Sequence, residues 1–212
     1  MAISWNEDRP EDRVLIERNS SALLRQIVGE AELRRLPSVP LAQSWHRRIY
    51  EGVALPVWYF AGEIRDSDPE YPELIGYEVA VGAAEGLPSA EVPSELVLFE
   101  SSVQMAVSHL DSLIPVDSKP ANVELVNSVI TLCALAHGEW VRIHPFANGN
   151  GRTARLWANW CAARYGLPLF VRVKPRPSGA AYAQAAADSM RGDHRLAVRA
   201  FLDMLDQYFL AQ

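Results

Sequence analysis

The sequence has few cysteines and no long hydrophobic run, and both absences limit the classes of protein to consider. Its two cysteines, Cys133 and Cys161, lie in apolar stretches without a CxxC spacing. We therefore expect reduced core thiols rather than a disulfide framework or a zinc site. No apolar run approaches the length of a membrane span, and the acidic start "MAISWNEDRPEDR" lacks the apolar segment of a signal peptide. We expect a cytoplasmic protein without membrane partners, with a secreted effector as the alternative.

The chain also lacks an excess of positive charge. It has 26 acidic and 20 basic side chains, a formal net charge of −6. Such a surface repels nucleic acid, so we expect no nucleic-acid partner, although a local basic site stays compatible with it. Hydrophobic residues, by contrast, make up 49% of the 212 residues. That content is sufficient for the large core of one compact domain.

Hydrophobic periodicity predicts a mostly helical, all-α chain. The central stretch "NVELVNSVITLCALAHGEWVRI" is apolar on nearly every face, which is typical of a helix buried by its neighbours. Glycines and capping residues predict where the other helices begin and end. The expected helices, roughly seven, are 11–29 ended by Gly29, Leu41 to Glu51 before Gly52, 94–113 capped by Ser94, the central one, 149–166, and two final helices capped by Ser178 and Asp193.

One segment breaks the helical period. "LPVWYFAGEIRD" is rich in aromatic and β-branched residues, and "IGYEVAV" alternates strictly, with the turn formers "SDPEYPE" between them. These features predict a β-hairpin with a long tip. Two interpretations stay open: the hairpin covers part of the core, or its exposed edge pairs with an extended peptide.

The stretch "HPFANGNGRTAR" combines residue types that suit phosphate chemistry. His144 precedes Pro145, and a residue before proline is disfavoured in the α region. We therefore expect His144 on a loop at the end of the central helix. An imidazole titrates near neutral pH, which suits a general base.

Glycines and arginines follow at the expected start of the next helix. Gly149 and Gly151 allow backbone N–H groups to approach an anion, and the helix N-terminus favours negative charge. Arg152 and Arg155 are three residues apart, so both side chains reach the first turn. Two guanidinium groups beside such amides predict a site for a phosphate chain.

The same stretch resembles the signature of the Fic domain family, His-Pro-Phe-x-(Asp/Glu)-Gly-Asn-Gly-Arg-x-x-Arg. Every fixed position matches except the acidic one, which is Asn148 here. The resemblance covers about residues 40–210. It implies a single Fic domain over 1–212, with residues 1–39 as a helical extension and a helical bundle that carries one β-hairpin flap.

The resemblance implies a reaction: transfer of AMP from ATP to a Ser, Thr or Tyr hydroxyl of a target protein. His144 would take the proton of that hydroxyl, and Phe146 would anchor the loop in the core. The implied flap, about Val57 to Val81, would align the target as an added strand. The residues that the resemblance assigns to the phosphates are Gly149, Asn150, Gly151, Arg152 and Arg155, with Arg155 nearest the γ-phosphate; those that it assigns to the flap are Trp58, Phe60, Gly62 and Ile64.

Asn148 has two interpretations. In the family the acidic residue at this position binds a magnesium ion that bridges the phosphates. An amide oxygen binds a hard cation less well, so the first interpretation is a weakened Mg²⁺ site. Asparagine is also a favoured N-cap, so the second interpretation is that its oxygen accepts an N–H from Asn150 or Gly151.

The resemblance leaves the regulation and the transferred group open. The family's inhibitory signature, Ser/Thr-x-x-x-Glu-Gly/Asn, has no match in the sequence. The site is then either unblocked or blocked by a separate antitoxin protein. The alternatives to AMP transfer are transfer of another phosphate-containing group, and a weakly active nucleotide-binding module that acts as a toxin or regulator.

Overall fold

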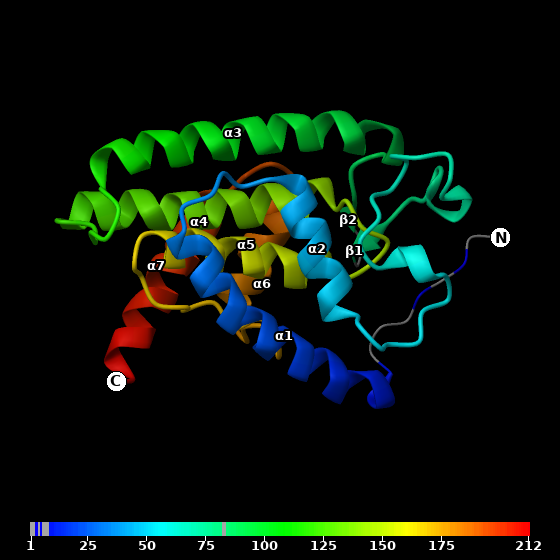
Figure 1. Ribbon diagram of the computed structural model, residues 1–212, viewed down its shortest axis with the longest axis horizontal. Coiled ribbons are helices and arrows are strands. Elements are labelled where there is room, and N and C mark those ends of the chain that lie inside the picture. The colour runs from blue at the N-terminus through cyan, green and yellow to red at the C-terminus, as the bar shows by residue number, and fades with distance from the viewer. Residues whose placement is uncertain (1–2, 4, 6–8, 82–83) are drawn as a thin grey trace.

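The structure, a computed structural model, describes residues 3, 5, 9–81 and 84–212. This described part folds as a helical bundle with one small pair of strands, which confirms the predicted fold class (Figure 1). Its α-helices are α1 (Pro10–Glu32), α2 (Val39–Ile49), α3 (Val92–Leu113), α4 (Val123–Ile143), α5 (Asn150–Arg164), α6 (Ala180–Ser189) and α7 (Arg195–Leu210).

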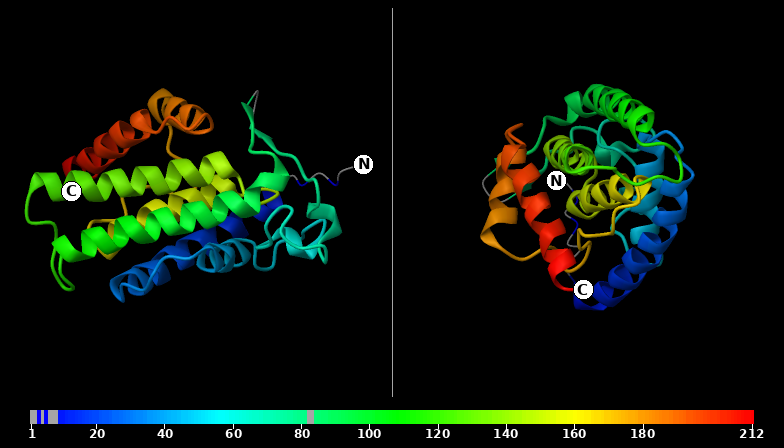
Figure 2. Two further views of the ribbon diagram at one scale, coloured as in Figure 1. Left: turned by 90° about the horizontal axis from the view of Figure 1, so that it is seen from above. Right: turned by 90° about the vertical axis from the view of Figure 1, so that its left-hand side faces the viewer.

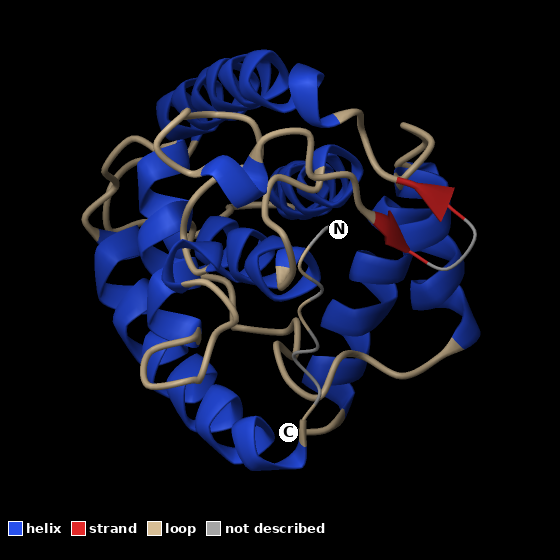
Figure 3. Ribbon diagram, turned by 90° about the vertical axis from the view of Figure 1, so that its right-hand side faces the viewer, coloured by secondary structure: helices blue, strands red, loops and turns tan. Residues whose placement is uncertain are grey.

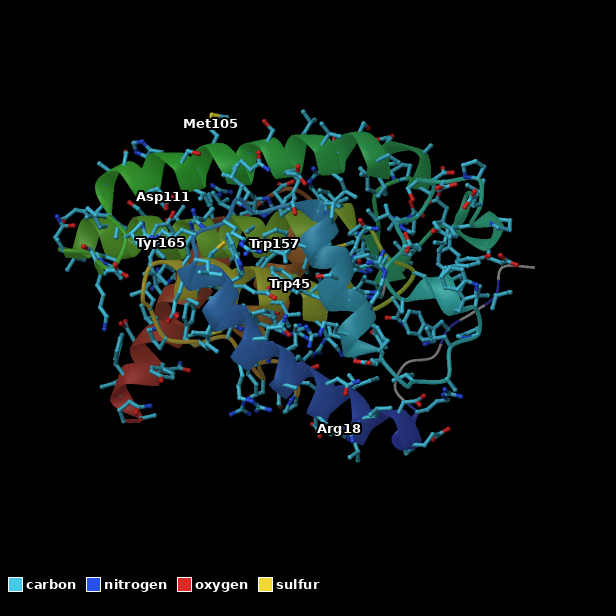
Figure 4. All side chains as sticks on the ribbon, viewed as in Figure 1. Arg18, Trp45, Met105, Asp111, Trp157 and Tyr165 are labelled. Carbon is cyan, nitrogen blue, oxygen red and sulfur yellow. The ribbon has the colours of Figure 1, made fainter. Side chains whose placement is uncertain are left out.

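Helices α4 and α5 form the centre of the bundle. They pack against each other, and α1, α3 and α7 surround them (Figure 2). Nearly every residue of α5 is buried, and α4 is apolar on most faces, as its sequence predicts. Trp45 of α2 and Trp157 of α5 meet in the middle of the molecule, with ring centroids 5.0 Å apart (Figure 4). The chemistry-bearing loop between α4 and α5 therefore emerges from the two most central helices of the fold.

Four predicted helix starts or ends are wrong. Helix α1 continues through Gly29 to Glu32. One glycine inside a helix costs only about 1 kcal/mol, and the burial of Ile27 and Ala31 on either side of it offsets that cost. Ser94 lies inside α3, where its hydroxyl donates to the carbonyl of Glu91. Gly179, not Ser178, precedes α6. His194, not Asp193, is the N-cap of α7, although the Asp193 side chain accepts the N–H of Arg195 at 3.1 Å.

The predicted hairpin at residues 57–81 is also wrong. Its first half contains the 3₁₀ turns Trp58–Phe60 and Pro72–Leu74, and the strands lie further on, where β1 (Ala80–Val81) pairs antiparallel with β2 (Ala84–Glu85) (Figure 3). The prolines of "SDPEYPE" cannot donate hydrogen bonds to a neighbouring strand, and several apolar residues of this region are buried in the core. The strand pair projects beyond the helices at the end of the bundle opposite the α3–α4 connection (Figure 2).

The expectation of reduced core thiols is confirmed in the described residues. Cys133 and Cys161 are unpaired and buried, and burial raises the pKa of both thiols, that of Cys161 to about 12. They are therefore inert core groups at neutral pH. No helix in the described part of the chain combines the length and the apolarity that a membrane crossing requires.

Candidate active site

His144 ends α4 in the predicted loop position. Its backbone is left-handed, with φ 53°, and its N–H donates to the carbonyl of Trp140 at 3.0 Å. The ring Nδ1 lies 2.9 Å from the carbonyl oxygen of Val141, which can only accept, so Nδ1 carries the proton. Burial, and the charge of Arg65, lower the pKa of His144 to about 4. At neutral pH its Nε2 is therefore an unprotonated acceptor.

The side chains of Phe146 and Asn150 fix the loop after His144. Phe146 is fully buried and stacks on His46 with ring centroids 3.9 Å apart, which confirms it as the anchor of the loop. The Asn150 amide accepts the N–H of Phe146 and donates to its carbonyl, both at 2.8 Å. The side chain of Asn150 thus holds the loop, and only its backbone N–H remains suited to an anion.

His46 joins the loop to the segment that follows α2. The Gly62 N–H donates to His46 Nδ1 at 2.9 Å, so Nε2 carries the proton and donates to the carbonyl of Asn148 at 2.9 Å. Burial lowers the pKa of His46 to about 3. Gly62, predicted to lie on a target-binding edge, instead supports the motif loop.

This neutral imidazole predicts a pH-dependent stability. The pKa of His46 lies below that of an unfolded histidine, about 6.5, so the unfolded state binds more protons and stability falls as the pH drops below about 6.5. We expect His46→Gln to be less stable at neutral pH but to lose stability less steeply between about pH 7 and about pH 5. Urea unfolding at several pH values measures both slopes. Replacing the exposed His109 by glutamine should keep the wild-type slope, and an unchanged slope in His46→Gln would contradict the assignment.

Helix α5 begins at a crowded glycine. Gly149, with φ 77°, is its N-cap; an added Cβ would collide with the Tyr50 hydroxyl and come within 2.7 Å of His46 Nε2. The predicted N-cap role of Asn148 is wrong, because its oxygen accepts the N–H of the adjacent Gly149, at 2.7 Å, rather than an N–H of the first turn. The N–H groups of Asn150 and Gly151 have no intrahelical acceptor, as helix geometry requires.

The two motif arginines are buried and pre-positioned around this first turn. Arg152 donates through Nη1 to the hydroxyl of Tyr50 at 2.7 Å. Arg155 donates through Nε to the carbonyl of Val173, at 3.0 Å, and its Nη1 lies 3.2 Å from the Cβ position of Gly151. The geometry therefore places one guanidinium on each side of the α5 N-terminus, an arrangement suited to a phosphate chain.

Sequence reasoning did not identify Arg65, a fully buried guanidinium beside His144. Its Nε donates to the carbonyl of His144 at 2.9 Å, and its terminal nitrogens donate to those of Tyr77, Leu87 and Ile143 at 2.7 to 3.2 Å. It joins the end of α4 to both sides of the strand pair. The sequence did carry one sign of its importance: Arg65 is the single basic residue among the many acidic ones of residues 57–85.

The structure separates the predicted flap residues. Phe60 and Ile64 are buried in the core, whereas Trp58 is 72% exposed. The segment beside His144 is instead the strand pair, since a Cβ on Gly86, directly after β2, would lie 3.6 Å from that of His144. The described residues beside His144 are therefore those at the strand pair, 80–81 and 84–86, and not the first half of the predicted region.

Comparison with known sequences agrees with this site. The model of the Fic/DOC family matches residues 38–162. A protein adenylyltransferase Fic of Drosophila mojavensis is 36% identical over 88 residues, which are 41% of this chain and 17% of that protein. One of Aedes aegypti is 37% identical over 79 residues, 37% of this chain and 15% of that protein. The match thus spans less than a fifth of the length of these curated relatives.

Solved structures share the fold at low sequence identity. A Fic domain containing signaling protein from Bacteroides thetaiotaomicron aligns over 90% of this chain and 65% of its own, with a TM-score of 0.58 and 17% identity. The BepC protein of Bartonella tribocorum, solved with bound AMPPNP, aligns over 88% of this chain and 86% of its own, with a TM-score of 0.54 and 13% identity. Motif, fold and family model agree, and the chain belongs to the Fic/DOC family.

Proposed function

We propose that this protein transfers AMP from ATP to a hydroxyl side chain of a target protein. The observation that carries the proposal is the unprotonated Nε2 of His144, held at the end of α4 a few residues before a glycine-rich helix N-terminus. The curated relatives are named protein adenylyltransferases, which supports the same reaction.

In the proposed reaction the target hydroxyl oxygen attacks the α-phosphorus of ATP. A bond forms between that oxygen and phosphorus, the bond from phosphorus to the β-phosphate oxygen breaks, and pyrophosphate leaves. The hydroxyl proton passes to Nε2 of His144. A pKa of about 4 makes His144 a weak base, but the hydroxyl becomes acidic as its oxygen bonds to phosphorus, and nearby phosphates favour the imidazolium.

We assign phosphate binding to the N-terminus of α5. The backbone N–H groups of Asn150 and Gly151 would donate to the phosphate oxygens, and Arg152 and Arg155 would neutralise their charge. The N–H of Gly149, which the resemblance also assigned to the phosphates, already donates to Oδ1 of Asn148. Nη1 of Arg152 already donates to the hydroxyl of Tyr50 and Nε of Arg155 to the carbonyl of Val173, so both side chains are ordered before the nucleotide binds.

The residues of the loop do not fit a protein-held magnesium ion. The Asn148 oxygen accepts the N–H of Gly149, and its nitrogen is also engaged in a hydrogen bond. No group of three or more His, Cys, Asp and Glu side chains in the described residues could hold a metal. Mg²⁺ as a cofactor stays a prediction, and the proposed step uses none.

We propose that the target lies along the strand pair. β1 and β2 are short and exposed, and Gly86 brings their base to His144, so an extended target segment could add as a further strand. Trp58, exposed nearby in the chain, is the one predicted flap residue still suited to contact the target.

The remaining assignments concern the whole protein. We propose one Fic domain over residues 1–212, because α1 of the N-terminal extension packs along α5 of the core. A cytoplasmic location, and a separate inhibitor protein that blocks the site, remain proposals that rest on the sequence alone.

Labelled ATP distinguishes the proposal from its alternatives. The protein is incubated with a lysate and with ATP labelled at either the α- or the γ-phosphate, and modified peptides are identified by mass spectrometry. Label from the α-phosphate alone, with an added AMP mass, supports AMP transfer. Label from the γ-phosphate indicates a kinase-like transfer, and ATP binding without any transfer indicates a nucleotide-binding module.

The position of Arg155 predicts a selective loss of ATP affinity. We expect Arg155→Ala to weaken ATP binding roughly tenfold to a hundredfold, because a charged hydrogen bond contributes about 1.5–3 kcal/mol, and to weaken ADP binding less. Calorimetric titration with both nucleotides measures the difference. Its buried contact with Val173 makes a thermal-stability control necessary. Equal losses for ATP and ADP would remove Arg155 from the γ-phosphate.

A further inference from the structure

Trp5, close to the start of the sequence, lies against the motif loop. Trp5 is buried, and its ring packs edge-on against Tyr50 with centroids 4.6 Å apart. The ring of Phe60 is also near, at 6.1 Å. Ile3 and Arg9, which flank Trp5 in the sequence, are also bound to the core: the Tyr77 hydroxyl donates to the carbonyl of Ile3 at 3.4 Å. On the other side, Arg9 donates to the carbonyl of Ala54 at 2.7 Å.

Asn148 makes the polar contact between the loop and this segment. Its Nδ2 donates to the carbonyl oxygen of Trp5 at 3.0 Å, while its Oδ1 accepts the N–H of Gly149 at 2.7 Å. An amide can do both, because it carries a donor and an acceptor. An ionised aspartate would place an acceptor against the acceptor of Trp5, and the contact would become repulsive. The chemistry of this contact therefore requires the amide that departs from the family pattern.

The contact also reaches a phosphate-binding residue. Trp5 packs on the ring of Tyr50, whose hydroxyl accepts the Nη1–H of Arg152 at 2.7 Å. Tyr50 additionally lies against the N-cap Gly149. Fixing the Trp5 ring thus limits the positions open to Tyr50, and through Tyr50 those open to Arg152.

We propose that Asn148 is a positioning residue that latches Trp5 to the motif loop, and that it occupies the family's acidic position for this reason instead of ligating a metal. The latch consists of the Asn148–Trp5 hydrogen bond and the packing of Trp5 on Tyr50. It holds Arg152 ready for the nucleotide. The part of the proposal that concerns Arg152 rests on the proposed function, whereas the latch itself does not.

Chymotrypsin cleavage after Trp5 tests the latch without nucleotide. When Trp5 detaches and rebinds faster than it is cleaved, the cleavage rate is proportional to the fraction of molecules in which Trp5 is detached. A change of 1.4 kcal/mol in the free energy of detachment changes that fraction about tenfold. We expect Asn148→Asp to accelerate cleavage after Trp5 by about tenfold or more through loss of the hydrogen bond and the added repulsion. Cleavage after the exposed Trp58 serves as the internal reference, and the exposed Asn127→Asp supplies the same charge change on α4.

Two outcomes would overturn the latch. One is equal cleavage after Trp5 in the wild type and in Asn148→Asp, relative to Trp58. The other is acceleration in the wild type by millimolar Mg²⁺ alone, which would show that a metal takes Asn148 from Trp5. Either result stands whether or not the protein transfers AMP, because no nucleotide is present.

Substitution of Trp5 tests the positioning of Arg152. Trp5→Phe keeps a ring against Tyr50 and should leave ATP affinity near the wild-type value, whereas Trp5→Ala should weaken it several-fold. Affinity is measured without metal, so that metal binding does not contribute. Equal affinities for Trp5→Ala and the wild type would overturn the positioning role. Failure of all three proteins to bind ATP would overturn this role together with the proposed function, and the cleavage result would still decide on the latch.

Discussion

Replacing His144 by alanine should lower the rate of AMP transfer by about 10²–10⁴-fold, the usual contribution of a general base, and leave ATP affinity within a few-fold. The two effects separate because the imidazole receives the proton but makes no phosphate contact in the proposed mechanism. The backbone contacts of His144, to Trp140 and to Arg65, do not use its side chain and survive the substitution.

A second variant controls for the backbone of His144. The left-handed conformation, φ 53°, is disfavoured for alanine but tolerated by asparagine. Asparagine can also donate to the carbonyl of Val141, as Nδ1 of His144 does, but it cannot take a proton at neutral pH. Single-turnover measurements should therefore show the same loss of transfer rate in His144→Asn as in His144→Ala. Nucleotide titration should show an ATP affinity within a few-fold of the wild-type value in both variants. Transfer at the wild-type rate in His144→Asn would remove the imidazole from the mechanism.

The chemistry-bearing loop could be predicted from the sequence because its signals are local. The proline after His144, the glycines around Asn150 and the apolar stretch before them act through neighbouring residues. The same reasoning located α4 and α5 to within a few residues. It could not assign Asn148, because the partner that decides its role, Trp5, is 143 residues away in the chain.

The hairpin prediction failed because tertiary burial overrode a local pattern. The aromatic residues at 58–60 are typical of a strand, but Phe60 is buried in the core and the N–H of Gly62 donates to His46 instead of to a neighbouring strand. Only the far end of the segment, from Ala80 onward, is free to pair as β1 with β2. Sequence alone predicted the existence of the strand pair and missed its position.

Arg65 gives the second large effect that we expect. Its guanidinium is fully buried and donates to four backbone carbonyls, those of His144, Ile143, Tyr77 and Leu87. Burial lowers the pKa of Arg65, although an arginine stays charged at any ordinary pH. Arg65→Ala would leave these acceptors without their donor and open a cavity beside His144. We expect a loss of about 3–5 kcal/mol in the free energy of unfolding, as for other broken buried polar networks.

The same network makes Arg65 a link between the catalytic base and the strand pair, so its loss should change transfer beyond its cost in stability. Arg65→Lys keeps the charge but has no planar fork to reach four carbonyls, and it should recover only part of the stability. At a temperature where Arg65→Lys is fully folded, we expect slower transfer with ATP affinity near the wild-type value. Arg47, whose pair with Glu63 is exposed, provides the control, since Arg47→Ala should cost no more than about 1 kcal/mol. If folded Arg65→Lys transfers AMP at the wild-type rate, Arg65 supports the fold alone and does not align His144 with the strands.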